Sequence, residues 1–149
     1  MRTGSASGTR APRFRASAAG NGKAPSAPPS VAVVDDDPAV LHALCFVLRL
    51  EGFEVDAFGN GADFLASDAP GSAACAVIDY GMEGLDGLAV AGVLRERGAM
   101  LPLVLISGTV TPRLRLLAAE AGFGTVLEKP LFGDVLAQAV TEALASARG

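Results

Sequence analysis

The sequence has few of the features that mark a membrane-embedded, secreted or disulfide-linked protein. Among its 149 residues are two cysteines, no tryptophan and 5% aromatic residues. No apolar run approaches the roughly 18 residues that a membrane span needs, and the N-terminus lacks the apolar centre of a signal peptide. We therefore expect a cytoplasmic protein with an aliphatic core, no membrane span, and Cys45 and Cys75 as buried free thiols.

Acidic residues are absent from the first 30 positions. This segment holds five Arg or Lys, so the net charge of −4 for the whole chain leaves −9 for the remainder. Such an acidic part argues against direct binding to duplex DNA, which needs a basic surface. Residues 1–30, rich in Ala, Ser and Pro, cannot bury enough apolar surface and are predicted to be disordered. A tail for nucleic acid or another acidic partner, a targeting sequence and a misassigned start codon remain alternatives.

Four short apolar runs each end in chemically active side chains. The residues that follow them are Asp35-Asp36-Asp37, Asp79, Ser107-Gly108 and Glu128-Lys129-Pro130. Short runs of this kind are typical of strands buried on both faces of a parallel sheet. Ligands bind outside the carboxyl ends of such strands, so we expect these groups to converge. Clustered carboxylates need positive charge nearby, which Lys129 and a hard divalent cation could supply.

Helix signals alternate with these runs. Asp37-Pro38 and Thr111-Pro112 each pair a capping side chain with Pro at the first helical position. The pattern predicts helices at 38–50, 62–66, 88–97, 112–122 and 133–145, another strand at 53–58, and loops at 68–72 and 81–87. Five successive βα units indicate an α/β fold with one parallel sheet and helices on both faces.

The four motifs together resemble the receiver domain of two-component response regulators. They lie at 33–38, 77–87, 106–108 and 128–130, and the resemblance covers about 31–145. It implies a flavodoxin-like (βα)5 fold with strand order 2-1-3-4-5 and a cis bond before Pro130. We expect a receiver domain at 31–147 with no output domain after it, acting through protein–protein contacts and not as a turnover enzyme.

The resemblance also implies a role for each residue at the sheet edge. Asp79 would take a phosphoryl group from a phosphohistidine on a histidine kinase or histidine phosphotransfer protein, and pass the signal to a downstream protein target. Mg²⁺ or Mn²⁺ would be held by Asp36, Asp79, the Gly81 carbonyl and, through water, Asp35. Phosphoryl oxygens would be bound by Lys129, the Ser107 hydroxyl and the backbone N–H groups of Tyr80 and Gly108.

Several residues receive other interpretations. Asp37 and Asp86 are expected to cap helices, and His42 to lie on the surface. Phe46 and Leu50 fall outside the core-facing stripe of their helix, where they either form a partner surface or are covered by a neighbouring helix.

The sequence departs from the family pattern at three positions, and other functions remain open. Glu83 stands where Pro is usual, Val126 where an aromatic switch residue is common, and Leu41 where Arg is frequent.

The main alternative is a receiver-fold interaction module that works without phosphorylation. A phospho-aspartyl phosphatase would be expected to have an Asp-x-Asp motif, whereas Asp79 is followed by Tyr80-Gly81. A flavin-binding protein would need a hydroxyl-rich phosphate loop where this sequence has Asp35-Asp36-Asp37.

Overall fold

Five short strands form a single parallel sheet in the computed structural model, which describes residues 27–148. The strands are β1 (Ser30–Val34), β2 (Glu54–Phe58), β3 (Cys75–Asp79), β4 (Leu103–Ser107) and β5 (Thr125–Glu128). Their order is β2-β1-β3-β4-β5, and every neighbouring pair is parallel. The predicted fold class and strand order are therefore confirmed.

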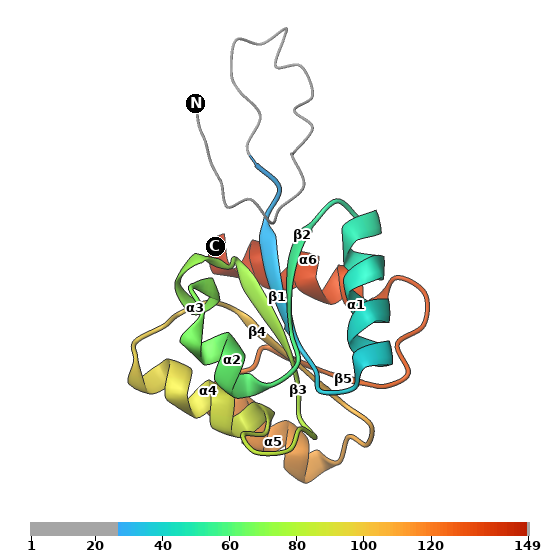
Figure 1. The fold of residues 1–149 in the computed structure, drawn as a ribbon. Coiled ribbons are helices and arrows are strands. Elements are labelled where there is room, and N and C mark those ends of the chain that lie inside the picture. The colour runs from blue at the N-terminus through green and yellow to red at the C-terminus, as the bar shows by residue number, and fades with distance from the viewer. Residues whose placement is uncertain (1–26, 149) are drawn as a thin grey trace, which may run out of the picture.

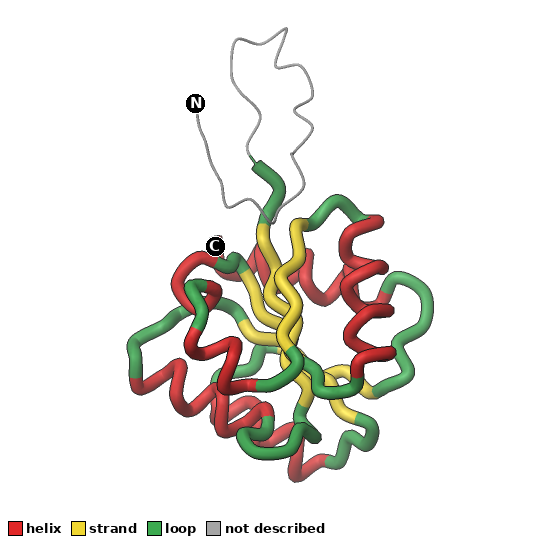
Figure 2. Tube along the Cα trace, viewed as in Figure 1, coloured by secondary structure: helices red, strands yellow, loops and turns green. Residues whose placement is uncertain are grey.

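Helices cover both faces of the sheet (Figures 1 and 2). Helices α1 (Pro38–Leu50) and α6 (Val135–Arg148) lie on one face. The other face carries α2 (Gly61–Ala66), α3 (Ala69–Ser72), α4 (Gly87–Glu96) and α5 (Pro112–Ala121). This three-layer arrangement leaves the carboxyl ends of the strands free of helices and available for a site.

Alternation along the central strands divides the core into two clusters. Val31 and Val33 of β1 pack with α1 and α6, whereas Ala32 and Val34 pack on the opposite side. All four side chains are fully buried, as is most of β3. Burial on both sides explains why these strands have continuous apolar sequences and no polar alternation.

The sequence signals for helix starts act as predicted. The Asp37 carboxylate accepts the N–H groups of Ala39 and Val40, with Pro38 opening α1. The Thr111 side chain accepts the N–H of Leu114 at the start of α5. These bonds satisfy donors that a helix leaves without internal partners, so each helix starts within a few residues of the strand that precedes it.

Three predictions of local structure differ from the structure by more than one residue. Residues 68–72 were expected to form a loop, but Ala69–Ser72 form the short helix α3, because Pro is tolerated in a first helical turn. The last helix begins at Val135 and not near Gly133, whose φ of +64° is left-handed. That helix also continues past residue 145 to Arg148. The Lys129–Pro130 peptide bond is cis, as predicted.

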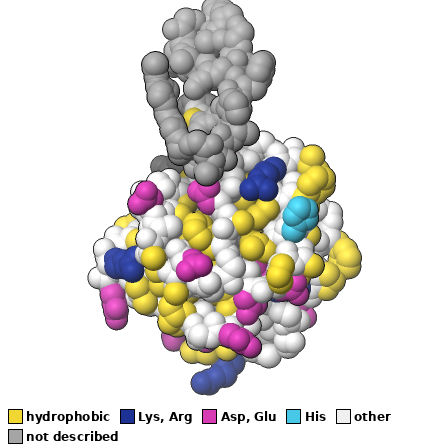
Figure 3. Space-filling view, viewed as in Figure 1, with side chains coloured by type: hydrophobic (Ala, Val, Ile, Leu, Met, Phe, Trp, Pro, Cys, Tyr) yellow, Lys and Arg dark blue, Asp and Glu magenta, His cyan; other side chains and the backbone are white. Residues whose placement is uncertain are grey.

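Surface exposure supports two further predictions. The single histidine, His42, is exposed, and Figure 3 shows it at the surface. Phe46 and Leu50 on α1 are 57% and 71% exposed. No helix within residues 27–148 has the length and apolarity to cross a membrane. The prediction of disorder was made for residues 1–30, of which residues 1–26 lie outside the described residues. Residues 27–29 have no regular structure, but Ser30 belongs to β1, so the predicted boundary is wrong by one residue.

Candidate functional site

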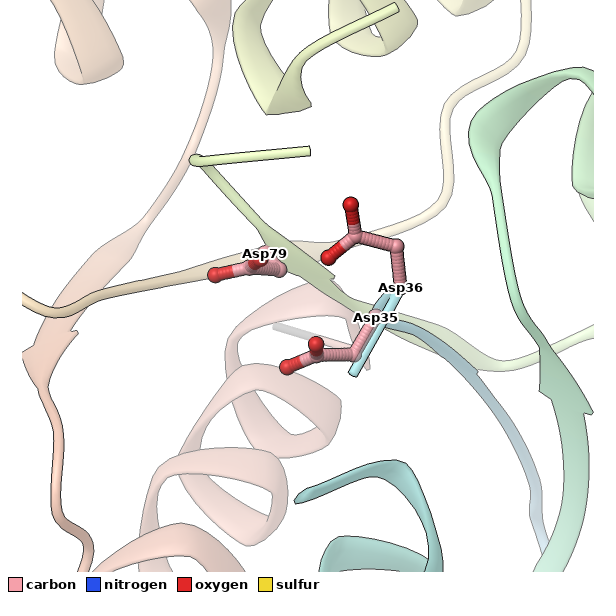
Figure 4. A group of neighbouring side chains, drawn as sticks. All are labelled: Asp35, Asp36 and Asp79. Carbon is pink, nitrogen blue, oxygen red and sulfur yellow. The ribbon is translucent and has the colours of Figure 1, made fainter. Parts of the chain in front are cut away.

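Three carboxylates meet at the carboxyl edge of the sheet (Figure 4). One oxygen from each of Asp35, Asp36 and Asp79 lies within 4.8 Å of the others. The sheet register explains this proximity, because Val34 of β1 pairs with Ile78 of β3, immediately before Asp35 and Asp79. Asp35 and Asp79 are buried and Asp36 is exposed, so the cluster opens to solvent on the Asp36 side.

Lys129 supplies the positive charge of this cluster from the end of β5. Its ammonium lies 3.1 Å from Asp35 Oδ2 and 3.1 Å from Asp79 Oδ1. Asp35 Oδ1 accepts the Asp37 N–H at 2.9 Å. No other described residue donates a hydrogen bond to the buried Oδ2 atom. One ammonium therefore balances two buried carboxylates, with the exposed Asp36 beside them.

The pKa values of Asp79 and Lys129 are both raised in this cluster. Burial raises the pKa of Asp79 above its ordinary value, and the nearby Asp35 charge raises it further, against the opposing effects of Lys129 and the Gly81 N–H. Burial alone would lower the pKa of Lys129, but its contacts with Asp35 and Asp79 outweigh burial and raise it. The ammonium is thus charged at neutral pH, while the acidic cluster still carries an excess of negative charge.

This donor set fits a hard divalent cation. Mg²⁺ and Mn²⁺ prefer oxygen ligands, and Mg²⁺ commonly uses one or two carboxylates and retains several waters. The cluster offers three carboxylates with only one ammonium among them. Within residues 27–148, the Lys129 ammonium contacts Asp35 and Asp79 but not Asp36. The exposed Asp36 carboxylate is therefore the most accessible of the three ligands.

Ser107 lies at the predicted place, at the end of β4, and is 4% exposed. Its hydroxyl donates to the Thr109 carbonyl oxygen at 2.8 Å and accepts the Thr109 N–H at 3.3 Å. The hydroxyl is therefore bound to its own loop in this structure. Gly108 is exposed, and the space around it is open, since a Cβ there would meet no atom within 4 Å.

The predicted role of the Tyr80 N–H is wrong. That group donates to the Ile106 carbonyl oxygen at 2.8 Å, so it continues the β3–β4 ladder and is not available to a ligand. The N–H that faces Asp79 belongs to Gly81, one residue further along. Sequence reasoning assigned Gly81 only a carbonyl role and therefore missed this donor.

A second contact missed from the sequence involves Glu83. Its N–H donates to Asp36 Oδ2 at 3.2 Å and links the loop after β3 to the loop after β1. The sequence feature that could have predicted this contact is the replacement of the usual Pro by a residue that has an N–H. Asp86, by contrast, accepts the Ala89 N–H at 2.9 Å and caps α4, as predicted.

The parallel 2-1-3-4-5 sheet with an acidic cluster and a lysine at its carboxyl edge defines a flavodoxin-like receiver fold. Residues 31–141 match the family model of the response regulator receiver domain, and the chain belongs to this family.

Curated relatives and solved structures agree. The chain is 38% identical over 120 residues to the transcriptional regulatory protein PrrA of Mycobacterium tuberculosis, covering 80% of this chain and 50% of PrrA. It is 33% identical over 114 residues to FixJ of Azorhizobium caulinodans, covering 76% of this chain and 54% of FixJ. The chain thus spans about half the length of these relatives.

Two solved structures illustrate the shared fold. The crystal structure of FixJ-N has a TM-score of 0.72 and 28% identity, covering 78% of this chain and 94% of that one. A CheY-like receiver from Methanospirillum hungatei JF-1 has a TM-score of 0.74 at 20% identity, covering 81% of this chain and 97% of that one. The second similarity establishes the fold alone.

Proposed function

We propose that Asp79 accepts a phosphoryl group from a phosphohistidine on a histidine kinase or histidine phosphotransfer protein. The observation that supports this most directly is the Lys129 ammonium, 3.1 Å from Asp79 Oδ1 within the cluster of three carboxylates. Receiver domains are signalling domains of two-component systems, and this chain belongs to their family. The domain would act as a stoichiometric phosphoacceptor and not as a turnover enzyme.

The chemistry would be a direct transfer. An Asp79 oxygen attacks phosphorus, the bond from phosphorus to the donor imidazole nitrogen breaks, and its electron pair remains on that nitrogen. Asp79 becomes an acyl phosphate. Lys129 would move its contact from the carboxylate to a phosphoryl oxygen, as a point charge suited to this task. The backbone N–H groups of Gly81 and Gly108 and the Ser107 hydroxyl would stabilise the other oxygens.

Asp36, Asp79 and the Gly81 carbonyl would hold Mg²⁺ or Mn²⁺, with Asp35 acting through water. When bound, the cation supplies the positive charge needed to bring an anionic phosphoryl group against carboxylates. Lys129 alone balances only one of the three negative charges in the cluster. The chain's own contribution is to fix these groups at the edge of a rigid sheet before the donor arrives.

The phosphorylated domain would signal in the cytoplasm by changing its contacts with a downstream protein. We expect no direct DNA contact from this domain, because its part of the chain is strongly acidic. PrrA and FixJ are named as transcriptional regulatory proteins. Since this chain matches only about half of each, their action on transcription is not carried over to it.

The test is intact mass after treatment with a small acyl phosphate or phosphoramidate donor and Mg²⁺. The wild-type protein should gain one acid-labile phosphoryl group, and excess chelator should prevent this. Asp79→Asn should abolish the gain, whereas Asp86→Asn should not, because Asp86 caps α4. Full labelling of Asp79→Asn would refute the assignment. A wild-type protein that binds Mg²⁺ but gains no mass would favour an interaction module that works without phosphorylation.

A further inference from the structure

Each carboxylate in the cluster faces a backbone N–H, but these N–H groups differ in origin. Asp35 accepts the N–H of Asp37, two positions further along its own segment, and Asp79 faces the N–H of Gly81, also two positions along. Asp36 is bonded across the site by Glu83, at 3.2 Å. Its anchor therefore belongs to a different loop, and its position depends on how the two loops sit together.

Asp36 has little else to fix it. Lys129 contacts the other two carboxylates, and within residues 27–148 the Glu83 N–H is the donor that the structure gives to Asp36. The side chain is exposed, so without this bond it could occupy several staggered rotamers. In Figure 4 one Asp36 oxygen points toward Asp79 and the other points away. Holding one oxygen therefore fixes the direction of the other.

The loop that carries Glu83 is built to present this N–H. On one side, Met82 is 5% exposed and packs into the core. On the other side, Gly84 has a φ of +77°, a left-handed conformation that turns the chain and favours glycine. In the receiver family, the usual residue at this position is proline, which has no N–H. The contact to Asp36 is possible here because the residue at position 83 is not proline.

We propose that Glu83 is a positioning residue for the divalent cation site. Its main-chain N–H holds Asp36 toward Asp35 and Asp79, so that the cation meets a cluster already arranged to receive it. The side chain of Glu83 is exposed and contributes only a screened charge. This inference rests on the proposed function, because it requires that the carboxylate cluster binds a cation.

Two substitutions separate the N–H from the charge. Glu83→Gln removes the charge and keeps the N–H, whereas Glu83→Pro removes both. Mg²⁺ affinity can be measured by calorimetry or by the fluorescence of Tyr80, the single tyrosine, which adjoins Asp79. Glu83→Gln should bind within about twofold of wild type, as expected for an exposed charge. Glu83→Pro should bind about tenfold more weakly, the scale expected when an outer partner of a metal ligand is lost.

A second measurement applies even if Glu83→Pro does not fold. Hydrogen exchange of the Glu83 amide should be slow in the wild-type protein and about tenfold faster in Asp36→Ala. The Val90 amide, which donates to the Asp86 carbonyl oxygen at 3.0 Å, serves as the control and should not change. Equal exchange of the Glu83 amide in both proteins would overturn the proposal.

The outcomes distinguish this inference from the proposed function. If Glu83→Pro folds and binds Mg²⁺ as tightly as Glu83→Gln, the positioning role is wrong while the metal site stands. If the wild-type protein binds no Mg²⁺, or if Asp36→Ala leaves its affinity unchanged, the metal site itself is wrong. Weaker binding in Glu83→Pro, together with the exchange result, supports the inference.

Discussion

Replacing Lys129 with Met should destabilise the folded protein by leaving two buried carboxylates without their shared cation. The Met side chain retains an apolar stem similar to that of Lys, so packing changes little. The ammonium that is lost lies 3.1 Å from both Asp35 and Asp79. Asp35 is 0% exposed and Asp79 is 4% exposed, so solvent can replace little of the lost interaction.

The magnitude follows from the geometry. Oxygens of the two carboxylates lie within 4.8 Å of each other. With an effective dielectric constant of about 20, two unit charges at that distance repel by about 3.5 kcal/mol. Measured losses on removing one partner of a buried ion pair are similar, about 3–5 kcal/mol. Because the Lys129 side chain is 23% exposed, we expect the lower end, about 3 kcal/mol at pH 7 without divalent cations.

The assay is urea unfolding followed by circular dichroism at pH 7 and pH 5, with chelator present. At both values Lys129 of the wild-type protein is charged, because its pKa is raised and its contacts are lost only as pH rises through that raised value. In Lys129→Met the pKa of Asp79 rises further, because Lys129 lowers it in the wild-type protein, so the folded state takes up a proton as pH falls. The stability gap between variant and wild type should therefore shrink at pH 5.

Two further measurements complete this test. Adding Mg²⁺ at pH 7 should recover part of the lost stability by mass action. Combining Lys129→Met with Asp79→Asn should recover more, because one of the two charges is gone. A Lys129→Met protein as stable as wild type at pH 7 would show that the ion pairs contribute nothing. An equal loss at both pH values, unrelieved by Asp79→Asn, would show that the loss comes from packing and not from charge.

Three other predictions concern the fold and its surface. Gly87→Ala should lose about 2 kcal/mol of unfolding free energy in urea, because the new Cβ would lie 2.8 Å from the Asp79 carbonyl oxygen; Gly92→Ala, with open space around it, should lose nothing. Phe46→Ala should slow phosphotransfer from the cognate kinase and leave labelling by a small donor unchanged, since this side chain is 57% exposed; equal slowing of both would assign it to the fold. Burial raises the pKa of Cys75 to about 12, so a thiol reagent at pH 8 should modify it only after unfolding.

The sequence predicted the sheet well because its physical signals are local. The run from Val31 to Val34 is apolar with no polar alternation, which is typical of a strand covered on both faces. The structure shows this run fully buried. Pro after a capping side chain marks a helix start by its fixed φ and missing N–H. Strand order is not local, since β1 lies between β2 and β3. It was obtained from the family resemblance and not from these signals.

The wrong prediction for the Tyr80 N–H shows a limit of local sequence signals. Which N–H groups remain free after a strand depends on how far the ladder continues, and that is decided by the neighbouring strand. Asp79 pairs with Ile106, and the Tyr80 N–H extends the ladder by one more bond. Pairing of this kind cannot be read from the residues around Asp79.

For Ser107, the local sequence predicts the position of the side chain but not its hydrogen-bond partner. The sequence places its hydroxyl at the correct strand end, but a hydroxyl rotates to whichever acceptor is near. Here that acceptor is the Thr109 carbonyl oxygen, at 2.8 Å. To donate to a phosphoryl oxygen on Asp79, the hydroxyl must give up this bond and release the start of the loop between β4 and α5. Since a hydrogen bond to a charged acceptor is stronger than one to a neutral carbonyl, the exchange would be favourable if Asp79 carried a phosphoryl group as proposed. The Ser107–Thr109 bond would then link the state of Asp79 to the conformation of a surface loop.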